Sequence, residues 1–197
     1  WVRDELAPVV QEWYPKITHL LPSDDYDAPR RVSIVFRKDM EGVASTGGTT
    51  VNCAANWFRG NLAGEAKGAV VHEMVHLVQQ YGRTRRGSAD ATPNPGWLVE
   101  GIADYVRWYI YEPQSGGANI SSGRRDRVRY DDSYRVSANF LNWVQNRDVS
   151  VVPKLNAAMR EGRYSEALWQ EFAGQPVEAL GQEWKASLAE TPKATTR

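Results

Sequence analysis

The five residues from His72 to His76 constrain this chain more than any other segment, because they place two imidazoles and a carboxylate close together. In an α-helix, positions i and i+4 share one face, so His72 and His76 can bind one metal ion. Glu73 then lies beside that ion, where its carboxylate can accept a proton from a water molecule that the metal activates. The segment therefore predicts a helix that can hold zinc.

A pattern with two free positions also arises by chance on amphipathic helices, where the histidines would be hydrogen-bonded helix residues and Glu73 a solvated charge. The neighbouring residues argue against this alternative, because apolar side chains surround the motif on nearly every side. These side chains are Ala69, Val70, Val71, Met74, Val75, Leu77, Val78 and Tyr81. Polar groups in a buried helix need partners, and one cation can serve all three. The spacing is that of the HExxH zinc metallopeptidases.

A catalytic zinc site needs a third protein ligand, and a second expected helix supplies a candidate. Residues 97–109 follow a turn signal and carry apolar side chains at helical spacing. Glu100 and Asp104 lie four residues apart on one face of that helix. Glu100 can bind the metal, while Asp104 can accept the second ring N–H of a ligand histidine and so fix its tautomer. Gly101 and Ala103 are small, which would let the two helices approach closely.

The residues alone leave other ligand sets open. Glu100 and Asp104 also suit the exposed acidic edge of an amphipathic helix. The metzincin pattern needs a glycine and a third histidine after the second one, and Gln79 and Gly82 occupy those positions, which excludes it. Asp90 and Asp104 are alternative oxygen ligands.

Several blocks of the chain resemble the plant basic secretory protein family and its bacterial and fungal relatives, a group of gluzincin-like zinc metallopeptidases. Residues 71–80 are similar to the HExxH helix of the family. Residues 98–107 are similar to its most distinctive block, which carries the sequence Glu-Gly-Ile-Ala-Asp-Tyr. Residues 133–141 are similar to a third block, and residues 152–185 resemble the closing helices. The resemblance covers most of the chain from about residue 30 onward.

The resemblance implies that His72, His76 and Glu100 bind Zn²⁺ and that Glu73 is the general base. It implies a zincin-like domain with the active site between the HExxH helix and the helix of Glu100 and Asp104. It also favours a secreted, extracellular protein. The chain departs from the basic members in charge, since 24 Lys and Arg balance 24 Asp and Glu. This balance puts polyanion binding in doubt but not the metal chemistry.

Length and composition predict one domain over residues 1–197, because 42% hydrophobic residues and eight tryptophans suffice for a sizeable core. No apolar run approaches about 18 residues, so we expect no membrane span. The chain begins at Trp1 without a signal-like segment, which suggests a mature or trimmed form. Cys53, the single cysteine, excludes an internal disulfide and is interpreted as a buried apolar residue rather than a nucleophile.

The hydrophobic pattern predicts an α+β fold, with a small N-terminal β-sheet first and a mainly helical C-terminal half after it. A first helix is expected at residues 2–20, interrupted near its prolines, and its His19 is interpreted as structural. Strands are expected at residues 31–37 and 51–58. Further helices are expected at residues 65–81, 97–112, 134–147, 151–161, 164–172 and 176–189.

Two features would suit a peptide substrate. In architectures that resemble this one, an edge strand just before the HExxH helix pairs with an extended peptide, and residues 51–59 occupy that place. An ordinary sheet strand is the equally good alternative. Tyr134 could donate its hydroxyl proton to the oxyanion of a tetrahedral intermediate, a role for which Tyr81, Tyr105 and Tyr130 also compete.

Two arginine-rich segments, residues 83–86 and 124–129, could steer acidic substrates, but such runs are more often solvated loop surface. We therefore expect no nucleic-acid partner. Residues 112–130 contain several glycines and serines and could form a lid over the site. A plain connector is the favoured interpretation.

The sequence thus predicts a monomeric, secreted zinc endopeptidase that acts on proteins or peptides and has no membrane partner. Glu73 and Tyr134 would be the catalytic residues, and Asp104 would orient a ligand histidine. Two alternatives stay open: a secreted binding or defence protein that keeps the fold without turnover, and a peptidase that depends on glycans. The intact set of ligands and base favours the enzyme.

Overall fold

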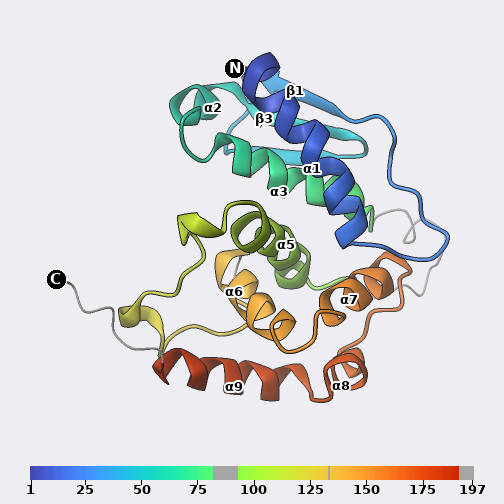
Figure 1. Cartoon of the computed structure of the whole chain (residues 1–197), viewed down its shortest axis with the longest axis vertical. Coiled ribbons are helices and arrows are strands. Elements are labelled where there is room, and N and C mark those ends of the chain that lie inside the picture. The colour runs from blue at the N-terminus through green and yellow to red at the C-terminus, as the bar shows by residue number, and fades with distance from the viewer. Residues whose placement is uncertain (82–92, 133, 191–197) are drawn as a thin grey trace.

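The computed structural model of the chain describes residues 1–81, 93–132 and 134–190 (Figure 1). It is an α+β structure with a small three-stranded sheet near the N-terminus and a mostly helical remainder, as expected. Within the described part of the chain, no helix is long and apolar enough to cross a membrane. The segments that were predicted as a basic loop at residues 83–86 and as a metal ligand at Asp90 lie outside the described residues.

The first helix runs without a break through both of its prolines. A short π-helical turn, η1 (Val2–Leu6), continues directly into α1 (Ala7–Leu20). Pro8 lies in the first turn of α1, where its missing N–H has no partner to lose. Pro15 lies inside the helix, so the expected interruption there is wrong.

The sheet has the strand order β1-β3-β2. β1 (Ser33–Arg37) runs parallel to β3 (Thr50–Ala54), and β2 (Ala44–Gly47) pairs antiparallel with β3 through a tight hairpin. β3 is therefore the central strand, so the expectation that residues 51–59 form an edge strand is wrong. The expected strand is also too long, because β3 ends at Ala54 and α2 (Ala55–Asn61) follows directly. β1 and β2 are the two edge strands, and the short, polar β2 has no apolar alternation that could have predicted it.

α3 (Ala66–Gln79) lies between the sheet and the helices of the second half. In Figure 1 it runs beside α1 and close to the sheet. Twelve of its 14 residues are buried, as expected for a helix with apolar residues on nearly every side. The helix ends where Gln80 adopts a left-handed conformation with φ of 47°.

The second half is a helical layer. It contains α5 (Gly96–Tyr105), which continues as the π-helical turn η2 (Val106–Tyr111), and the helices α6 (Tyr134–Gln145), α7 (Val151–Arg160), α8 (Ala167–Ala173) and α9 (Val177–Glu190). Two short 3₁₀ turns, η3 (Pro113–Ser115) and η4 (Ser122–Arg124), lie between η2 and α6. In Figure 1, α9 lies along the outer side of α6, and α8 lies beside one end of α9. The expected helices are therefore present, with ends that differ by a few residues.

The close contact at Gly101 joins α5 to α6. A Cβ at Gly101 would lie 2.8 Å from the Cβ of Ser137 and 3.3 Å from Leu141 Cδ1, so only glycine fits without movement. The expectation that Gly101 lets α5 approach the HExxH helix is wrong, because this residue faces the opposite side of α5. The spacing of small residues does not say which neighbour they admit.

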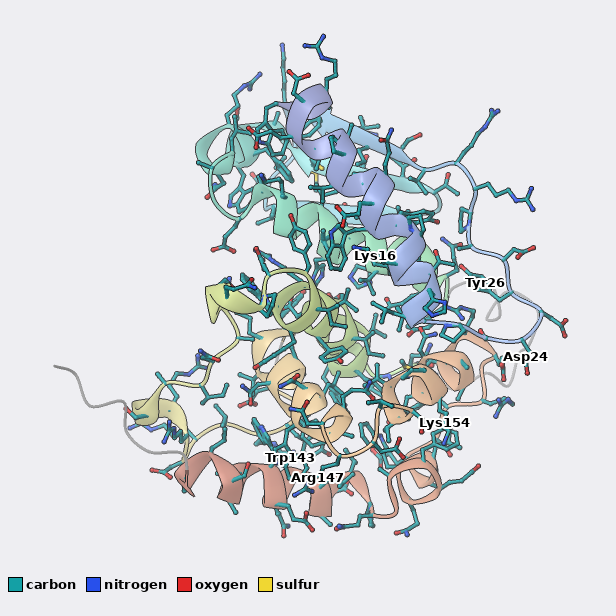
Figure 2. All side chains as sticks on the ribbon, in the orientation of Figure 1. Lys16, Asp24, Tyr26, Trp143, Arg147 and Lys154 are labelled. Atoms are coloured by element: carbon teal, nitrogen blue, oxygen red, sulfur yellow. The ribbon has the colours of Figure 1, made fainter. Side chains whose placement is uncertain are left out.

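One hydrophobic core includes residues from α1, α3, the sheet and the C-terminal helices. Its C-terminal part is aromatic, with the ring of Phe140 close to those of Trp97, Trp169 and Trp184. At the surface of this layer, Arg147 lies over the ring of Trp143 at 3.4 Å from its centroid (Figure 2). These contacts fix α6, which α5 packs against.

Arg160 ties the end of α3 to the C-terminal layer. Its guanidinium donates to the carbonyl oxygens of Gln79 at 3.2 Å, Val78 at 3.0 Å and Leu21 at 3.1 Å. It also lies 3.9 Å from the ring centroid of Tyr26, which Figure 2 labels. A cation at the last carbonyls of a helix satisfies acceptors that the helix itself leaves open. Arg160 thus holds the C-terminal end of the HExxH helix.

Candidate metal centre

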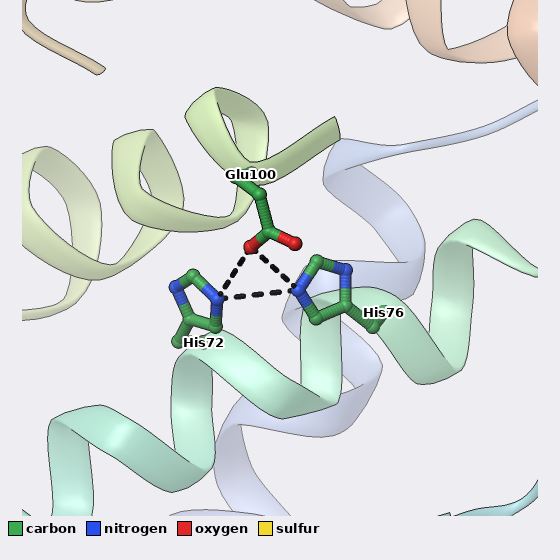
Figure 3. A group of neighbouring side chains, drawn as sticks. All are labelled: His72, His76 and Glu100. Carbon is green, nitrogen blue, oxygen red and sulfur yellow. Dashed lines mark hydrogen bonds and ion pairs between the residues drawn. The ribbon is translucent and has the colours of Figure 1, made fainter. Parts of the chain in front are cut away.

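His72 and His76 on α3 and Glu100 on α5 point toward one another (Figure 3). The two Nε2 atoms lie 3.2 Å apart, and Glu100 Oε2 lies 3.1 Å from His72 Nε2 and 3.2 Å from His76 Nε2. Ligand atoms about 2.0–2.1 Å from a tetrahedral zinc ion are ~3.3 Å apart. The three side chains therefore have the separations that one bound ion requires, and together they could hold a metal ion.

Local sequence explains how α5 presents its acidic face. The helix begins after Pro95, whose backbone is extended and whose carbonyl oxygen accepts from the amides of Leu98 and Val99 at 3.1 Å. Leu98 and Ile102 are completely buried. With these two residues turned into the core, Glu100 and Asp104 lie on the face toward α3.

Each histidine ring is oriented by a second hydrogen bond. His72 Nδ1 lies 2.7 Å from Asp104 Oδ1, the contact expected for that pair, and His76 Nδ1 lies 2.7 Å from Gln79 Oε1. Gln79 Nε2 donates to the carbonyl oxygen of Val99 at 3.0 Å, which turns Oε1 toward His76. Both partners are acceptors, so both Nδ1 atoms carry the proton.

This inferred proton placement bears on whether a metal ion fits between the three side chains. In the neutral form of the two rings, with the protons on Nδ1, the Nε2 atoms of His72 and His76 present lone pairs to each other and to the Glu100 carboxylate. Three acceptors that converge in a partly buried site are unfavourable unless a positive charge lies between them. Neutral imidazole and carboxylate are also the ligands of catalytic zinc sites with three protein ligands. The donor set fits such an ion.

The pKa shifts of the free protein indicate the same demand for positive charge. Burial opposes a charge on His72, but hydrogen bonds with Asp104 and Glu100 outweigh it and raise the pKa of His72 to about 9. Burial likewise opposes ionisation of Glu100, but His72 and His76 lower the pKa of Glu100 to about 2. The carboxylates therefore favour a cation at the centre of the group.

Glu73 faces the sheet rather than α5. It is 8% exposed, and Thr46 Oγ1 on β2 lies 2.7 Å from its Oε2 and 3.0 Å from its backbone carbonyl oxygen. Because consecutive helix residues are about 100° apart, Glu73 cannot share the face of His72 and His76. The carboxylate instead lines the same cleft from the side of β2.

A cleft of about 1440 Å³ contains the three converging side chains. β2 forms part of its wall with Ala44 and Thr46, and Tyr134 at the start of α6 forms another part. Sites for small ligands typically have volumes of about 300–1,000 Å³. The larger volume here suits an extended ligand.

A family model described as "Peptidase of plants and bacteria" matches residues 4–184. The chain belongs to this family. It is the basic secretory protein family, so the resemblance drawn from the sequence blocks is confirmed. No curated protein and no solved structure matches the chain. The family description gives the general activity, that of a peptidase.

Tyr134 of this basic secretory protein family member has its ring centroid 6.0 Å from that of His72 and is 48% exposed to the cleft. The charge of Glu100, together with partial burial, raises the pKa of Tyr134, so the hydroxyl keeps its proton. Its φ of 31° is a left-handed value that costs energy for a residue other than glycine. Tyr134 is thus an exposed and protonated tyrosine beside His72, which together with His76 and Glu100 forms the metal group.

The competing tyrosines are engaged elsewhere. Tyr81 also lines the cleft, but its hydroxyl donates to Asn156 Oδ1 at 2.9 Å. The ring of Tyr105 stacks on that of Tyr109, and Tyr130 packs against Trp97. These contacts leave Tyr134 as the best candidate of the four.

Cys53, His19 and the segment 112–130 were also considered in the sequence analysis. Cys53 is buried in β3, where burial, followed by the charge of Glu73, raises the pKa of its thiol to about 12, so it is no nucleophile. His19 is exposed on α1, far in sequence from the metal group. The segment 112–130 contributes Arg124 to the lining of the cleft and buries Val128.

Two residues of the site were missed by the sequence analysis. Gln79 had served there only to exclude a metzincin. The one available signal was an amide side chain three residues after a ligand histidine in a buried helix. Thr46 gave no signal, because it lies in a short polar segment and contacts Glu73 across 27 positions of sequence.

Proposed function

We propose that this chain is a zinc-dependent peptidase. The convergence of His72 Nε2, His76 Nε2 and Glu100 Oε2 within 3.2 Å of one another carries the proposal. Membership in a peptidase family supports it. A zinc ion bound by these three residues would polarise the scissile carbonyl group and acidify a water molecule in the fourth position.

The side chains around the metal group have distinct roles in this mechanism. Glu73 accepts the proton of the attacking water and passes it to the leaving amine. Tyr134 donates a hydrogen bond to the carbonyl oxygen as negative charge develops on it. Asp104 and Gln79 hold the rings of His72 and His76 in orientation through their Nδ1–H groups.

The substrate we propose is an extended peptide that pairs with β2, the edge strand that lines the cleft. The carbonyl oxygen of Val43 accepts from the amide of Ala54 at 2.9 Å. This bond shows which residues next to and within β2 direct their backbone groups to β3. Hydrogen-bonded pairs alternate along an antiparallel ladder, so the backbone groups of Ala44 and Thr46 face the open edge. A peptide added there would bind through its backbone and tolerate many sequences. Endopeptidase action follows, because the sequence has no acidic motif of the kind that holds a free N-terminus.

The family is named for secretion, and we propose that the protein acts outside the cell as a monomer. Its substrates would be proteins or peptides, with or without attached glycans. A peptide library and a glycoprotein digest, tested side by side, would separate these two substrate classes.

The decisive experiment compares the parental protein with Glu73→Gln on a mixed peptide library, after the zinc content of both has been measured and matched. The substitution keeps the shape of the side chain and removes the base, so we expect cleavage to fall by about 10²- to 10⁴-fold. Zinc binding should be unchanged, because Glu73 is not a ligand. Cleavage by Glu73→Gln at the parental rate would refute the mechanism. A zinc-loaded parent without cleavage would favour a binding protein that keeps the fold.

A further inference from the structure

The edge strand and the proposed general base are joined by a side chain. Thr46 Oγ1 lies 2.7 Å from Glu73 Oε2. A hydroxyl that donates to a carboxylate typically has a donor–acceptor distance of about 2.5–2.7 Å. The observed distance is therefore that of a charge-assisted hydrogen bond rather than a loose contact. This bond occupies one carboxylate oxygen of Glu73 and leaves Oε1 for the reaction.

The same residue faces the cleft with its backbone. Thr46 and Ala44 direct their N–H and C=O groups to the open edge of β2, as the register with β3 requires. The Thr46 side chain points to α3. A peptide seated on β2 would therefore contact the backbone of the residue whose hydroxyl holds Glu73.

We propose that Thr46 is a positioning residue that holds the Glu73 carboxylate at a fixed distance from the peptide on β2. The inference rests on the proposed function and assigns the residue that sets the geometry of its base. The backbone of Thr46 would bind the peptide, and its side chain holds Glu73. A peptide that pairs with β2 would therefore lie in a fixed register relative to the Glu73 carboxylate. A displacement of about 1 Å in a reacting group can lower a rate by about 100-fold.

A purely structural role for Thr46 is the rival explanation. Its hydroxyl also lies 3.0 Å from the backbone carbonyl oxygen of Glu73, so it could simply fasten β2 to α3. Loss of a residue that only attaches β2 to α3 would lower folding stability and substrate affinity together. Loss of the hydroxyl would lower the melting temperature under either role, because a hydrogen bond to the buried carboxylate is removed. Only a positioning residue would lower kcat while KM stays nearly unchanged.

The test uses three variants of the zinc-loaded protein. Thr46→Val removes the hydroxyl and keeps the β-branched shape, Thr46→Ser keeps the hydroxyl, and Thr50→Val makes the same change on the neighbouring strand. Thr50 lies next to Val51, the partner of Thr46, so its side chain is on the other face of the sheet. We expect kcat of Thr46→Val to fall by about 10- to 100-fold with KM within twofold. Thr46→Ser and Thr50→Val should keep the parental kcat.

Each other outcome overturns the inference. A parental kcat in Thr46→Val refutes it directly. Equal losses in Thr46→Val and Thr46→Ser that follow the melting temperature assign Thr46 a structural role. If the zinc-loaded parent cleaves nothing, the proposed function fails, and crystal structures still decide whether Thr46 holds Glu73. In that case an unmoved Glu73 carboxylate in Thr46→Val refutes the inference, and a carboxylate that rotates only in this variant supports it.

Discussion

Asp104→Asn is the sharpest perturbation of the metal group, because it removes one charge and almost no volume. Asp104 is 4% exposed, and its Oδ1 lies 2.7 Å from His72 Nδ1. The asparagine can still accept that hydrogen bond through its amide oxygen. What it loses is the negative charge that makes the imidazole a better ligand.

The magnitude follows from the nature of this bond. A charge-assisted hydrogen bond is roughly twice as strong as a neutral one, and bonds to charged groups contribute about 1.5–3 kcal/mol. Replacing it by a neutral bond should cost about 1–1.5 kcal/mol of metal binding, which is roughly a tenfold weaker Kd. Loss of an outer partner of a ligand histidine typically weakens binding by about 10- to 100-fold, so the two estimates agree at the lower end.

The assay is a competition titration of zinc against a chelator at fixed pH and ionic strength. Asp131→Asn is the matched control. Asp131 pairs with Arg129, so this substitution removes the same charge away from the metal group. We expect Asp104→Asn to bind zinc about tenfold more weakly and Asp131→Asn to match the parent. A Kd within twofold of the parent in Asp104→Asn would show that Asp104 does not support a ligand, and the assignment of His72 would lose its main electrostatic argument.

Two stability predictions test how the site is supported. Arg160→Met removes one donor from each of three carbonyl oxygens, of which Val78 O and Leu21 O keep bonds from Tyr26 and Asn156, so the free energy of unfolding should fall by about 1–3 kcal/mol. The control Arg163→Met replaces an exposed arginine three residues on and should change it by under about 0.5 kcal/mol in denaturant melts. Equal unfolding midpoints for Arg160→Met and Arg163→Met would contradict the role of Arg160 in holding the end of α3. Gly101→Ala should cost about 1–3 kcal/mol and weaken zinc binding by moving α5, since its Cβ would meet Ser137 at 2.8 Å, while Gly60→Ala in α2, with open space around it, should be neutral or stabilising. Unchanged stability and zinc affinity in Gly101→Ala would mean that α5 is not held by α6.

Much of the helical framework could be predicted because its signals are local. The apolar surround of residues 65–81 indicates a buried helix by itself, and α3 is buried on nearly every side. The strand edge could not be predicted, because β2 is four residues long and polar. Its place depends on the hairpin with β3, a tertiary fact that no periodicity encodes.

The side chains around the metal group likewise include some that local spacing could predict and some that it could not. His72, His76, Glu100 and Asp104 could be proposed from the i, i+4 spacing within two helices, because helix geometry fixes which side chains share a face. How the helices meet was not local, and neither was the contact of Thr46 with Glu73, which joins a strand to a helix. Sequence spacing therefore predicts side chains that share a helix face better than contacts between separate elements.

The motif itself explains why two different elements must flank α3. Consecutive residues of a helix are about 100° apart, so a base next to a ligand histidine in sequence must lie on a different face from the ligands. One neighbour has to complete the metal group and another has to hold the base. Here α5 supplies Glu100 and Asp104 on one side, and β2 supplies Thr46 on the other. The cleft lies between these two neighbours, so a peptide that pairs with β2, as proposed, would lie within it.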